Sequence, residues 1–360
     1  MKKLILLLLF LLSLSLPAQS LLERYAARLV PPARYVAPYV PIPPVIDGHV
    51  GEAEWGMAVW TAPFVDICGA SRPAPRYATQ VKMLCDDTNF YVAARLEEPN
   101  VTARLRQRDT IVWRDNDFEV FLDPNGDGVE YFEIEVNPLG TLLDLIMTYP
   151  YRSGGTFLSA WDCPGLKVAV SIDGTLNNSA DLDRGWWVEM AIPHEAIRVG
   201  FNGGLKQGRL WRVNFSRVEW LMKGADEENW VWSPTGIVNM HMPERWGFVY
   251  LCPEETEPLT VDFENLMPDF HKPHFDGYSL YQLMWTLFYA EQDYESEHKT
   301  YAKSLKMLPL AASDRRLFCQ LANLKLEATT STFEITARLG TKSYSLNHQG
   351  QWCEKKKGLK

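Results

Sequence analysis

The strongest constraint on the fold is a pair of alternating segments that flank a glycine-rich turn, WRDNDFEVFLDPNGDGVEYFEIE, between Trp113 and Glu135. In FEVFL and YFEIEV an apolar residue recurs at every second position, which is the period of a β-strand with one buried face. The intervening Asn-Gly and Asp-Gly dipeptides are typical of tight hairpin turns. This stretch predicts a half-buried antiparallel hairpin whose outward face carries Glu119, Glu133 and Glu135.

Alternating segments of the same kind continue on both sides of the hairpin. QVKMLC and FYVAARLEE precede it, and LLDLIM, LKVAVSI, GWWVEMAI, RLWRVNFSRVEW and RWGFVYLC follow it, each bounded by turn residues. No amphipathic helix longer than about three turns interrupts them. Many short strands in this arrangement predict a mainly β chain, with an antiparallel β-sandwich over residues 46–252.

The N-terminal residues predict export. MKKLILLLLFLLSLSLPAQS combines two lysines with an apolar run that is too short to span a bilayer comfortably, so residues 1–20 are expected to form a cleaved signal peptide. A retained N-terminal anchor is the alternative. Residues 21–45 contain six prolines, which favours an extended lead-in over a packed element. We expect a periplasmic, cell-surface or secreted protein with no membrane insertion after signal cleavage.

The C-terminal part changes character twice. Residues 253–275 are rich in Pro, Glu, Asp and His, which predicts a linker. In residues 276–360, apolar residues first recur at helical spacing and then alternate, so we expect one long helix followed by a small antiparallel sheet. This order, with YESEHKTYAKSL, is similar to the helix-then-sheet head of pilin-like proteins. The unit is expected to be a structural appendage or to contact an envelope protein partner.

Charge and cysteine content narrow the classes of partner. A net charge of -9 disfavours nucleic acid and anionic membrane surfaces. Thirteen tryptophans and fifteen tyrosines suit a sugar-binding surface, and they are equally what a large core contains. Six cysteines in an exported chain permit disulfides, and a bridge between Cys319 and Cys353 is the first candidate pairing to test. The seven histidines show no zinc-ligand spacing.

The DPNGDG turn has two interpretations. Asp123, Asn125 and Asp127 alternate oxygen-bearing side chains around glycines as calcium loops do, and Glu130 offers a further carboxylate. The same dipeptides also form hairpin turns that need no metal. A structural calcium ion and a metal-free turn are both compatible with this sequence.

The motifs, taken in order, resemble a known family. They are IDGHVGEAEW, VKMLCDDTNFYVAARLEE, DNDFEVFLDPNGDGVEYFEIEVN, WWVEMAIP, LWRVNFSRVEW, and NWVWSP with MPERWGFVYL. Their order resembles carbohydrate-binding module family 9 and, more closely, the stand-alone family 9-like exported proteins of Bacteroidetes. The resemblance covers residues 41–252 and implies a β-sandwich that binds a mono- or oligosaccharide.

The resemblance also implies site residues. In the xylanase-attached members two tryptophans sandwich the reducing-end sugar, assisted by carboxylate, amide and guanidinium groups. A W-x-x-D-x-x-E pattern holds the first tryptophan and is matched by Trp113 and Glu119, with Asn116 at the aspartate position and the aspartate itself shifted to Asp115 or Asp117. An N-x-x-W pattern holds the second and is matched by Asn229 and Trp232. The implied site therefore clamps a ring between the two tryptophans, while Glu119 and Asn229 bind its hydroxyls.

One family residue has no counterpart. The arginine on the strand after the acidic hairpin is replaced, since FEIEV offers Glu133 and Glu135. Arg212 and Asn214 alternate onto one face in LWRVNFS and are candidates to restore hydrogen-bond donors. Each candidate also fits a structural role, the tryptophans as core or loop packing and the glutamates as a solvated strand face.

We predict non-catalytic carbohydrate binding, at glycan ends, in support of polysaccharide catabolism. A glycoside hydrolase that uses surface carboxylates is one alternative, because Glu133 and Glu135 would lie about 7 Å apart on a strand. A surface strand, however, lacks the enclosed pocket that raises the pKa of a catalytic acid. A periplasmic haem-binding β-sandwich is the other alternative, suggested by Met240, His241 and Met242 and detectable by a Soret band.

Overall fold

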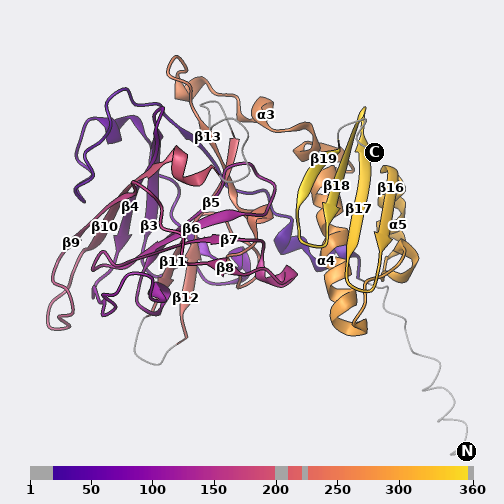
Figure 1. Ribbon diagram of the computed structural model, residues 1–360, viewed down its shortest axis with the longest axis horizontal. Coiled ribbons are helices and arrows are strands. Elements are labelled where there is room, and N and C mark those ends of the chain that lie inside the picture. Colours follow the sequence, from indigo (N-terminus) through magenta and orange to yellow (C-terminus); the bar gives the residue numbers. More distant parts are fainter. Residues whose placement is uncertain (1–18, 199–209, 221–225, 356–360) are drawn as a thin grey trace, which may run out of the picture. The chain divides into compact units, whose positions relative to one another are not determined.

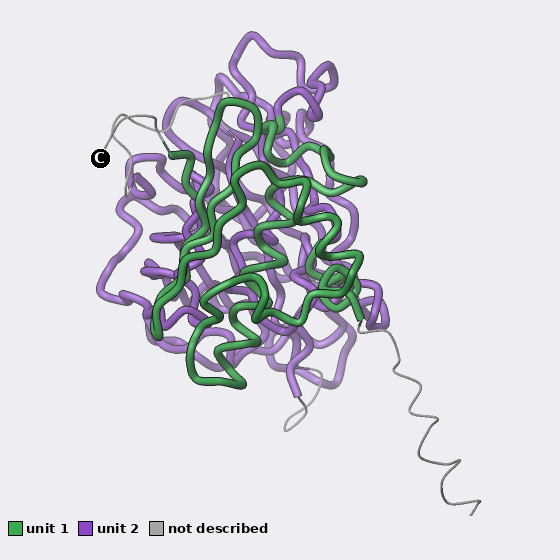
Figure 2. Tube along the Cα trace, turned by 90° about the vertical axis from the view of Figure 1, so that its right-hand side faces the viewer, with its two compact units in different colours: residues 1–29, 267–348, 353–360 green, residues 30–266, 349–352 purple. Residues whose placement is uncertain are grey.

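The computed structural model describes residues 19–198, 210–220 and 226–355 (Figure 1). The chain divides into two compact units (Figure 2): unit 1 comprises residues 1–29, 267–348 and 353–360, and unit 2 comprises residues 30–266 and 349–352. Nearly all of the predicted signal peptide lies outside the described residues. Within the described ranges no helix has the length and apolar character needed to cross a bilayer.

Unit 2 is built from two sheets (Figure 1). The larger has nine strands; seven follow the order β1 (Arg34–Ala37), β13 (Gly247–Leu251), β11 (Leu210–Glu219), β5 (Phe118–Asp123), β6 (Tyr131–Val136), β7 (Leu142–Met147) and β8 (Phe157–Leu158), while β12 (Glu228–Val231) pairs with β11 and with β2 (Val65–Asp66). The smaller has the order β3 (Thr79–Cys85), β4 (Asn89–Glu97), β10 (Gly185–Pro193) and β9 (Lys167–Asp173). The predicted mainly β fold with antiparallel sheets is confirmed.

The acidic hairpin is present as predicted. Strand β5 pairs antiparallel with β6, and Val120 lies opposite Ile134. Alternate residues of both strands enter the core between the two sheets, where they pack with residues of β4 and β10 such as Val92 and Val188. Because side chains alternate along a strand, Glu119, Phe121, Glu133 and Glu135 project from the opposite face of the sheet.

The prediction that residues 21–45 form an extended, unpacked lead-in is wrong. Residues Arg34–Ala37 form β1, which pairs parallel with β13 and places Tyr35 opposite Val249. The Tyr35 hydroxyl donates to the Val59 carbonyl at 2.7 Å, and Ala37 is fully buried. The prolines flank RYVA without interrupting it, so the segment keeps the N–H groups that strand pairing requires.

Unit 1 contains the predicted helix and sheet. Helix α4 (Leu280–His298) begins at a capping box formed by Ser279 and Gln282. The four-stranded sheet has the order β16 (Ala322–Ala328), β17 (Phe333–Leu339), β18 (Lys342–Asn347) and β19 (Trp352–Lys355). Unit 1 also contains α2 (Leu21–Arg24), β14 (Pro273–Phe275), β15 (Tyr278–Ser279) and α5 (Ala312–Phe318). Helix α3 (Phe263–Leu266) belongs to unit 2. Residues 253–275, predicted as a linker, thus hold short elements.

The predicted disulfide between Cys319 and Cys353 is not formed. Cys319 follows α5 directly and precedes β16, whereas Cys353 lies on β19. These two strands are the opposite edges of the four-stranded sheet. The interpretation failed because spacing along the chain does not reveal the order of strands within a sheet.

Helix α4 carries a buried acid with a pH-dependent effect on stability. Glu291 is fully buried and accepts a hydrogen bond from the Ala302 N–H at 2.9 Å. Burial raises the pKa of Glu291 from 4.5 to about 7. The stabilisation from the protonated folded form is complete below the unfolded pKa and is lost as the pH rises through the folded pKa. We expect Glu291→Gln to raise the free energy of unfolding at pH 8 by on the order of 1–2 kcal/mol and to change it little at pH 4.

Chemical denaturation at the two pH values measures this difference. Glu297 is exposed on the same helix, and Glu297→Gln is the matched control, expected to show no comparable pH dependence. An equal effect of Glu291→Gln at both pH values would contradict the assignment.

Candidate functional site

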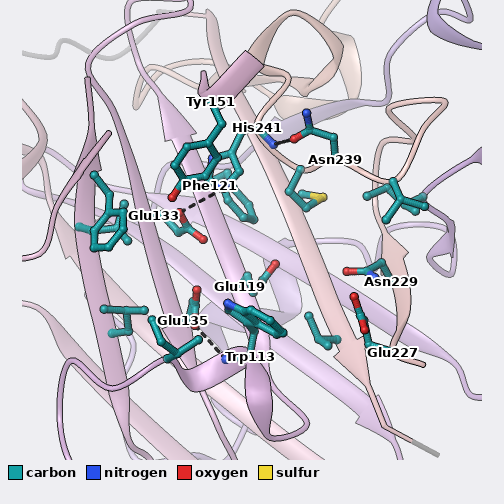
Figure 3. Close-up of a pocket in the computed structure, with 18 residues that line it drawn as sticks. Trp113, Glu119, Phe121, Glu133, Glu135, Tyr151, Glu227, Asn229, Asn239 and His241 are labelled. Carbon is teal, nitrogen blue, oxygen red and sulfur yellow. Dashed lines mark hydrogen bonds and ion pairs between the residues drawn. The ribbon is translucent and has the colours of Figure 1, made fainter. Parts of the chain in front are cut away.

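A pocket of about 450 Å³ opens on the face of the larger sheet that points away from the core (Figure 3). The acidic hairpin of β5 and β6 forms the floor of the pocket, because every second side chain of these strands points away from the core. Its polar lining residues are Glu119, Glu133, Glu135, Glu227, Asn229, Asn239 and His241, and its aromatic ones are Trp113, Phe121, Tyr151 and Phe157. None of the described lining residues is a lysine or an arginine.

Trp113 is presented to the pocket by a short 3-10 helix, Val112–Arg114, which is separated from β5 by three residues. Its backbone N–H donates to Glu135 Oε2 at 3.1 Å, and its carbonyl accepts from Trp220 Nε1 at 2.8 Å. The side chain remains 37 % exposed. Figure 3 shows Trp113 and Tyr151 at opposite ends of the pocket, with Glu133 and Glu135 between them. The pocket therefore has an aromatic side chain at each end.

The carboxylates on the floor are buried, which corrects the predicted solvated strand face. Glu119, Glu133 and Glu135 are each almost inaccessible to solvent, and Asp117 beside them is completely so. Burial, followed by repulsion among the neighbouring acids, raises the pKa of each of these four carboxyls. The acidic strands therefore have the burial that raises the pKa of a carboxyl group.

His241 forms one side wall and is held in a fixed orientation. Its Nδ1 lies 3.0 Å from the Tyr131 hydroxyl. Its ring packs edge-on against the Tyr151 ring, with the two ring centres 4.5 Å apart. Burial and the nearby Arg152 lower the pKa of His241 to about 4, so the ring is neutral at physiological pH. Its Nε2 lies 4.0 Å from Glu133 Oε2. This nitrogen can form a hydrogen bond with a ligand while the ring stays neutral.

Comparison with family models matches residues 46–253 to the family described as carbohydrate family 9 binding domain-like. The match covers more than half of the chain. The chain belongs to this family. The predicted resemblance to family 9 is thereby confirmed. Comparison with curated proteins found no match.

Solved structures with this fold include a crystal structure from Bacteroides uniformis ATCC 8492 described as "a putative carbohydrate-binding protein", with a TM-score of 0.50 and 19% identity over 61% of this chain and 98% of that one. Two further structures are family 9 modules from Caldicellulosiruptor kristjanssonii, described in complex with cellotriose and with glucose. Their TM-scores are 0.43 and 0.44, each at 18% identity, over 63% and 62% of this chain and 97% and 98% of theirs.

The family 9 pattern misplaced the second tryptophan. Asn229 lines the pocket, but Trp232 is only 9 % exposed and lies in the core between the sheets, 5.8 Å from the Phe215 ring. The predicted clamp of Trp113 and Trp232 is therefore not formed. Residues three apart fall on opposite faces of an extended chain, so Asn229 and Trp232 could not both face the pocket.

Arg212 and Asn214 also serve the fold. They share one face of β11 as predicted, but neither lines the pocket. The Arg212 guanidinium donates to the Trp246 carbonyl at 2.8 Å, and its carbon lies 3.7 Å from the centre of the Phe248 ring. Asn214 donates to the Ser233 carbonyl at 2.9 Å and accepts from the Ser233 N–H at 3.0 Å. Their hydrogen bonds join neighbouring segments of the larger sheet.

The side chains of the DPNGDG turn accept hydrogen bonds from its own backbone. Asp123 accepts from the N–H groups of Gly126 and Gly128, each at 2.9 Å. Asn125 accepts from the Asp127 N–H at 3.2 Å, and the N–H of Val129 donates to Asp127. Glu130 is exposed. These bonds are those of a self-supporting hairpin turn, and a calcium ion bound by Asp123, Asn125, Asp127 and Glu130 stays a prediction.

A second aromatic surface lies on the smaller sheet. The rings of Trp60 and Trp187 are 6.1 Å apart, and Lys82 and Arg95 each place a cationic group about 5 Å from the Trp60 ring. Neither tryptophan is among the residues that line the acidic pocket. Trp187 is therefore a suitable control for experiments on Trp113.

Sequence reasoning missed several pocket residues. Tyr151 begins a three-residue 3-10 helix, Phe157 lies on a two-residue strand and Asn239 lies in a loop, and such short segments have no periodic pattern that identifies the face of a side chain. The sequence indicates His241 only as a candidate haem ligand. The family pattern does not mark Glu133 or Glu135 as ligand-binding residues, because they stand where the family has an arginine.

Proposed function

We propose that this pocket binds a terminal ring of a mono- or oligosaccharide without converting it. One observation supports this most directly: in the segment that matches family 9, a partly exposed indole stands beside a pocket rich in carboxylate and amide groups. A flat aromatic ring covers the apolar C–H face of a pyranose. Oxygen and amide groups at fixed positions then bind its hydroxyls.

In this proposal Trp113 is the main stacking platform. Tyr151 and Phe157, both exposed aromatic residues of the pocket, take the part that the family pattern assigned to the second tryptophan. Glu119 and Asn229 bind hydroxyls, as the family pattern implied, and His241 adds a neutral hydrogen-bonding group. The acids on the floor replace the family arginine and favour a ligand that donates hydrogen bonds.

The expected affinity is modest, on the order of micromolar to millimolar, because one stacked ring and a few hydrogen bonds form in a wet site. A pocket of about 450 Å³ lies at the lower end of the range for small-molecule sites. This size favours a glycan end over the middle of a long chain. We further propose that an exported protein with this activity supports polysaccharide catabolism by retaining released sugars.

Substitution of Trp113 by alanine tests the proposal. We expect Trp113→Ala to weaken sugar binding at least tenfold, which corresponds to about 1.4 kcal/mol, because the indole supplies the stacking surface. A glycan array first identifies the ligand, and isothermal titration calorimetry then compares the variants. Arrays with native and borohydride-reduced oligosaccharides separate end recognition from chain recognition.

Trp187→Ala is the control and should leave the affinity unchanged. Binding that survives Trp113→Ala and is lost in Trp187→Ala would place the sugar on the smaller sheet and contradict the proposal.

Glycoside hydrolysis is the second candidate, and the acid cluster is the observation that favours it. A buried carboxyl with a raised pKa can remain protonated at neutral pH and act as a general acid. Product analysis by chromatography on the sugars that bind decides between the candidates. Release of new reducing ends that is lost in Glu119→Gln would identify an enzyme; unchanged oligosaccharides support the binding protein.

A further inference from the structure

Two acids of the pocket floor, Glu119 and Glu135, converge with Asp117, which lies beside them. One carboxylate oxygen from each of Asp117, Glu119 and Glu135 lies within 4.8 Å of the other two, and all three residues are buried. Calcium ions take oxygen ligands at about 2.3–2.6 Å, so two oxygens that share an ion lie at most about 5 Å apart. The spacing is therefore compatible with a shared cation.

Several other buried acids of unit 2 are compensated either by a guanidinium group or by hydrogen-bond donors. Arg108 pairs with Asp144, Arg152 with Glu244, and Arg217 with both Glu98 and Glu219. Glu189 instead accepts hydrogen bonds from Trp55 Nε1 and from the Gly48 N–H, each at 2.7 Å. Among the described residues, no lysine or arginine forms an ion pair with Asp117, Glu119 or Glu135. Buried charges without a partner are expensive, so the cluster requires either protons or a cation.

The surroundings of Asp117 favour a bound cation over a proton. The side chain is 0 % exposed, and its Oδ1 accepts from the Val218 N–H at 3.2 Å. Its Oδ2 is equally buried and has no hydrogen-bond partner in the parts of the chain that the structure describes. A buried carboxylate oxygen that lacks a donor loses its hydration without compensation. A cation at the point where the three carboxylates meet would supply the missing interaction.

We propose that Asp117, Glu119 and Glu135 bind a divalent cation of the calcium class at the floor of the pocket. Glu119 and Glu135 line the pocket, so coordination positions that the protein does not fill face its interior. Calcium takes six to eight oxygen ligands, which leaves several positions open. As a consequence that rests on the proposed function, two hydroxyls of the bound sugar would complete the coordination.

Terbium, which replaces calcium in oxygen sites, provides the direct test. Trp113 lines the same pocket as Glu119 and Glu135, and its backbone N–H donates to Glu135, so we expect its indole to sensitise terbium emission. We expect tryptophan-excited emission to saturate with terbium and to be displaced by calcium. Asp117→Asn and Glu135→Gln should each weaken terbium binding at least tenfold. In the unmodified chain calcium should also raise the Tm by a few degrees, a shift that both variants lose.

Two control variants locate the ion. Asp162→Asn removes an acid from the group of Asp109, Asp144 and Asp162, where Arg108 supplies the counter-charge, and should leave terbium binding unchanged. Asp127→Asn examines the DPNGDG turn. Loss of terbium binding in Asp127→Asn, with binding retained in Asp117→Asn, would assign the ion to the turn and overturn the proposal.

Absence of both the emission and the calcium-dependent Tm shift would show that the acids hold protons, and would also overturn it. Removal of one carboxylate relieves repulsion, so in chelator Asp117→Asn is expected to melt no lower than the unmodified chain. Should it fail to fold, Glu135→Gln decides the matter. Sugar titrations with calcium and with chelator separate the two proposals: intact calcium binding without sugar binding defeats only the proposed function.

Discussion

Replacement of Trp232 by alanine is expected to destabilise unit 2 by about 3–5 kcal/mol, the range for truncation of a large core side chain. The indole fills the space beside Phe215 and against Gly247, where an added Cβ would lie only 2.3 Å from the ring. The side chain lies in the core between the two sheets, so its removal leaves a cavity there. Equilibrium unfolding in urea measures the loss. The family pattern predicted the opposite outcome, a lost ligand with an intact fold.

Trp113→Ala is the matched comparison, because it removes the same side chain from a partly exposed position. Its free energy of unfolding should stay within about 1 kcal/mol of the unmodified chain. If Trp232→Ala were equally mild and instead abolished sugar binding, the placement of Trp232 in the core would be wrong.

Replacement of Arg217 by methionine is expected to cost about 3–5 kcal/mol, since it breaks a buried ion pair by removing one partner. The guanidinium is 0 % exposed and lies 2.8 Å from Glu98 and 2.6 Å from Glu219. It also donates to the Glu97 carbonyl at 2.8 Å. Without it two buried acids face each other, and burial with repulsion from Glu219 already raises the pKa of Glu98.

Arg184 provides the control for this prediction. Its ion pair with Asp173 has a similar distance, 3.1 Å, but its side chain is 84% exposed. Arg184→Met should therefore change the free energy of unfolding by about 0–1 kcal/mol. A loss of that small size in Arg217→Met would show that Glu98 and Glu219 do not depend on the guanidinium.

Strand periodicity carried most of the fold prediction. The hairpin of β5 and β6 and the helix α4 follow from the spacing of apolar residues, and both are present. Periodicity failed to predict the burial of the outer face of the larger sheet. An alternating pattern marks one face as polar, yet every residue of β5 and β6 is buried, because turns and other segments cover the acids. Burial of a polar face depends on distant segments that a local pattern does not contain.

The candidate site was predictable only where it lay on regular strands or on a family motif. Trp113 and Glu119 are in one such motif, and both line the pocket. Tyr151 reaches it from a short 3-10 helix before β8 and His241 from a loop after β12, and no local signal links them. Alternation along the extended segment from Asn229 to Trp232 already argues against a site that contains both side chains.

The discontinuous composition of both units has a consequence for synthesis on the ribosome. The N–H of Leu21 donates to the side chain of Asp314, 293 residues later, and the N–H of Trp352 donates to the carbonyl of Asp127. Neither unit has its full complement of residues until the last part of the chain has emerged. Translation must therefore run almost to its end before either unit can close, and a fragment cut to residues 46–253 would lack β1 and the contacts of residues 349–352.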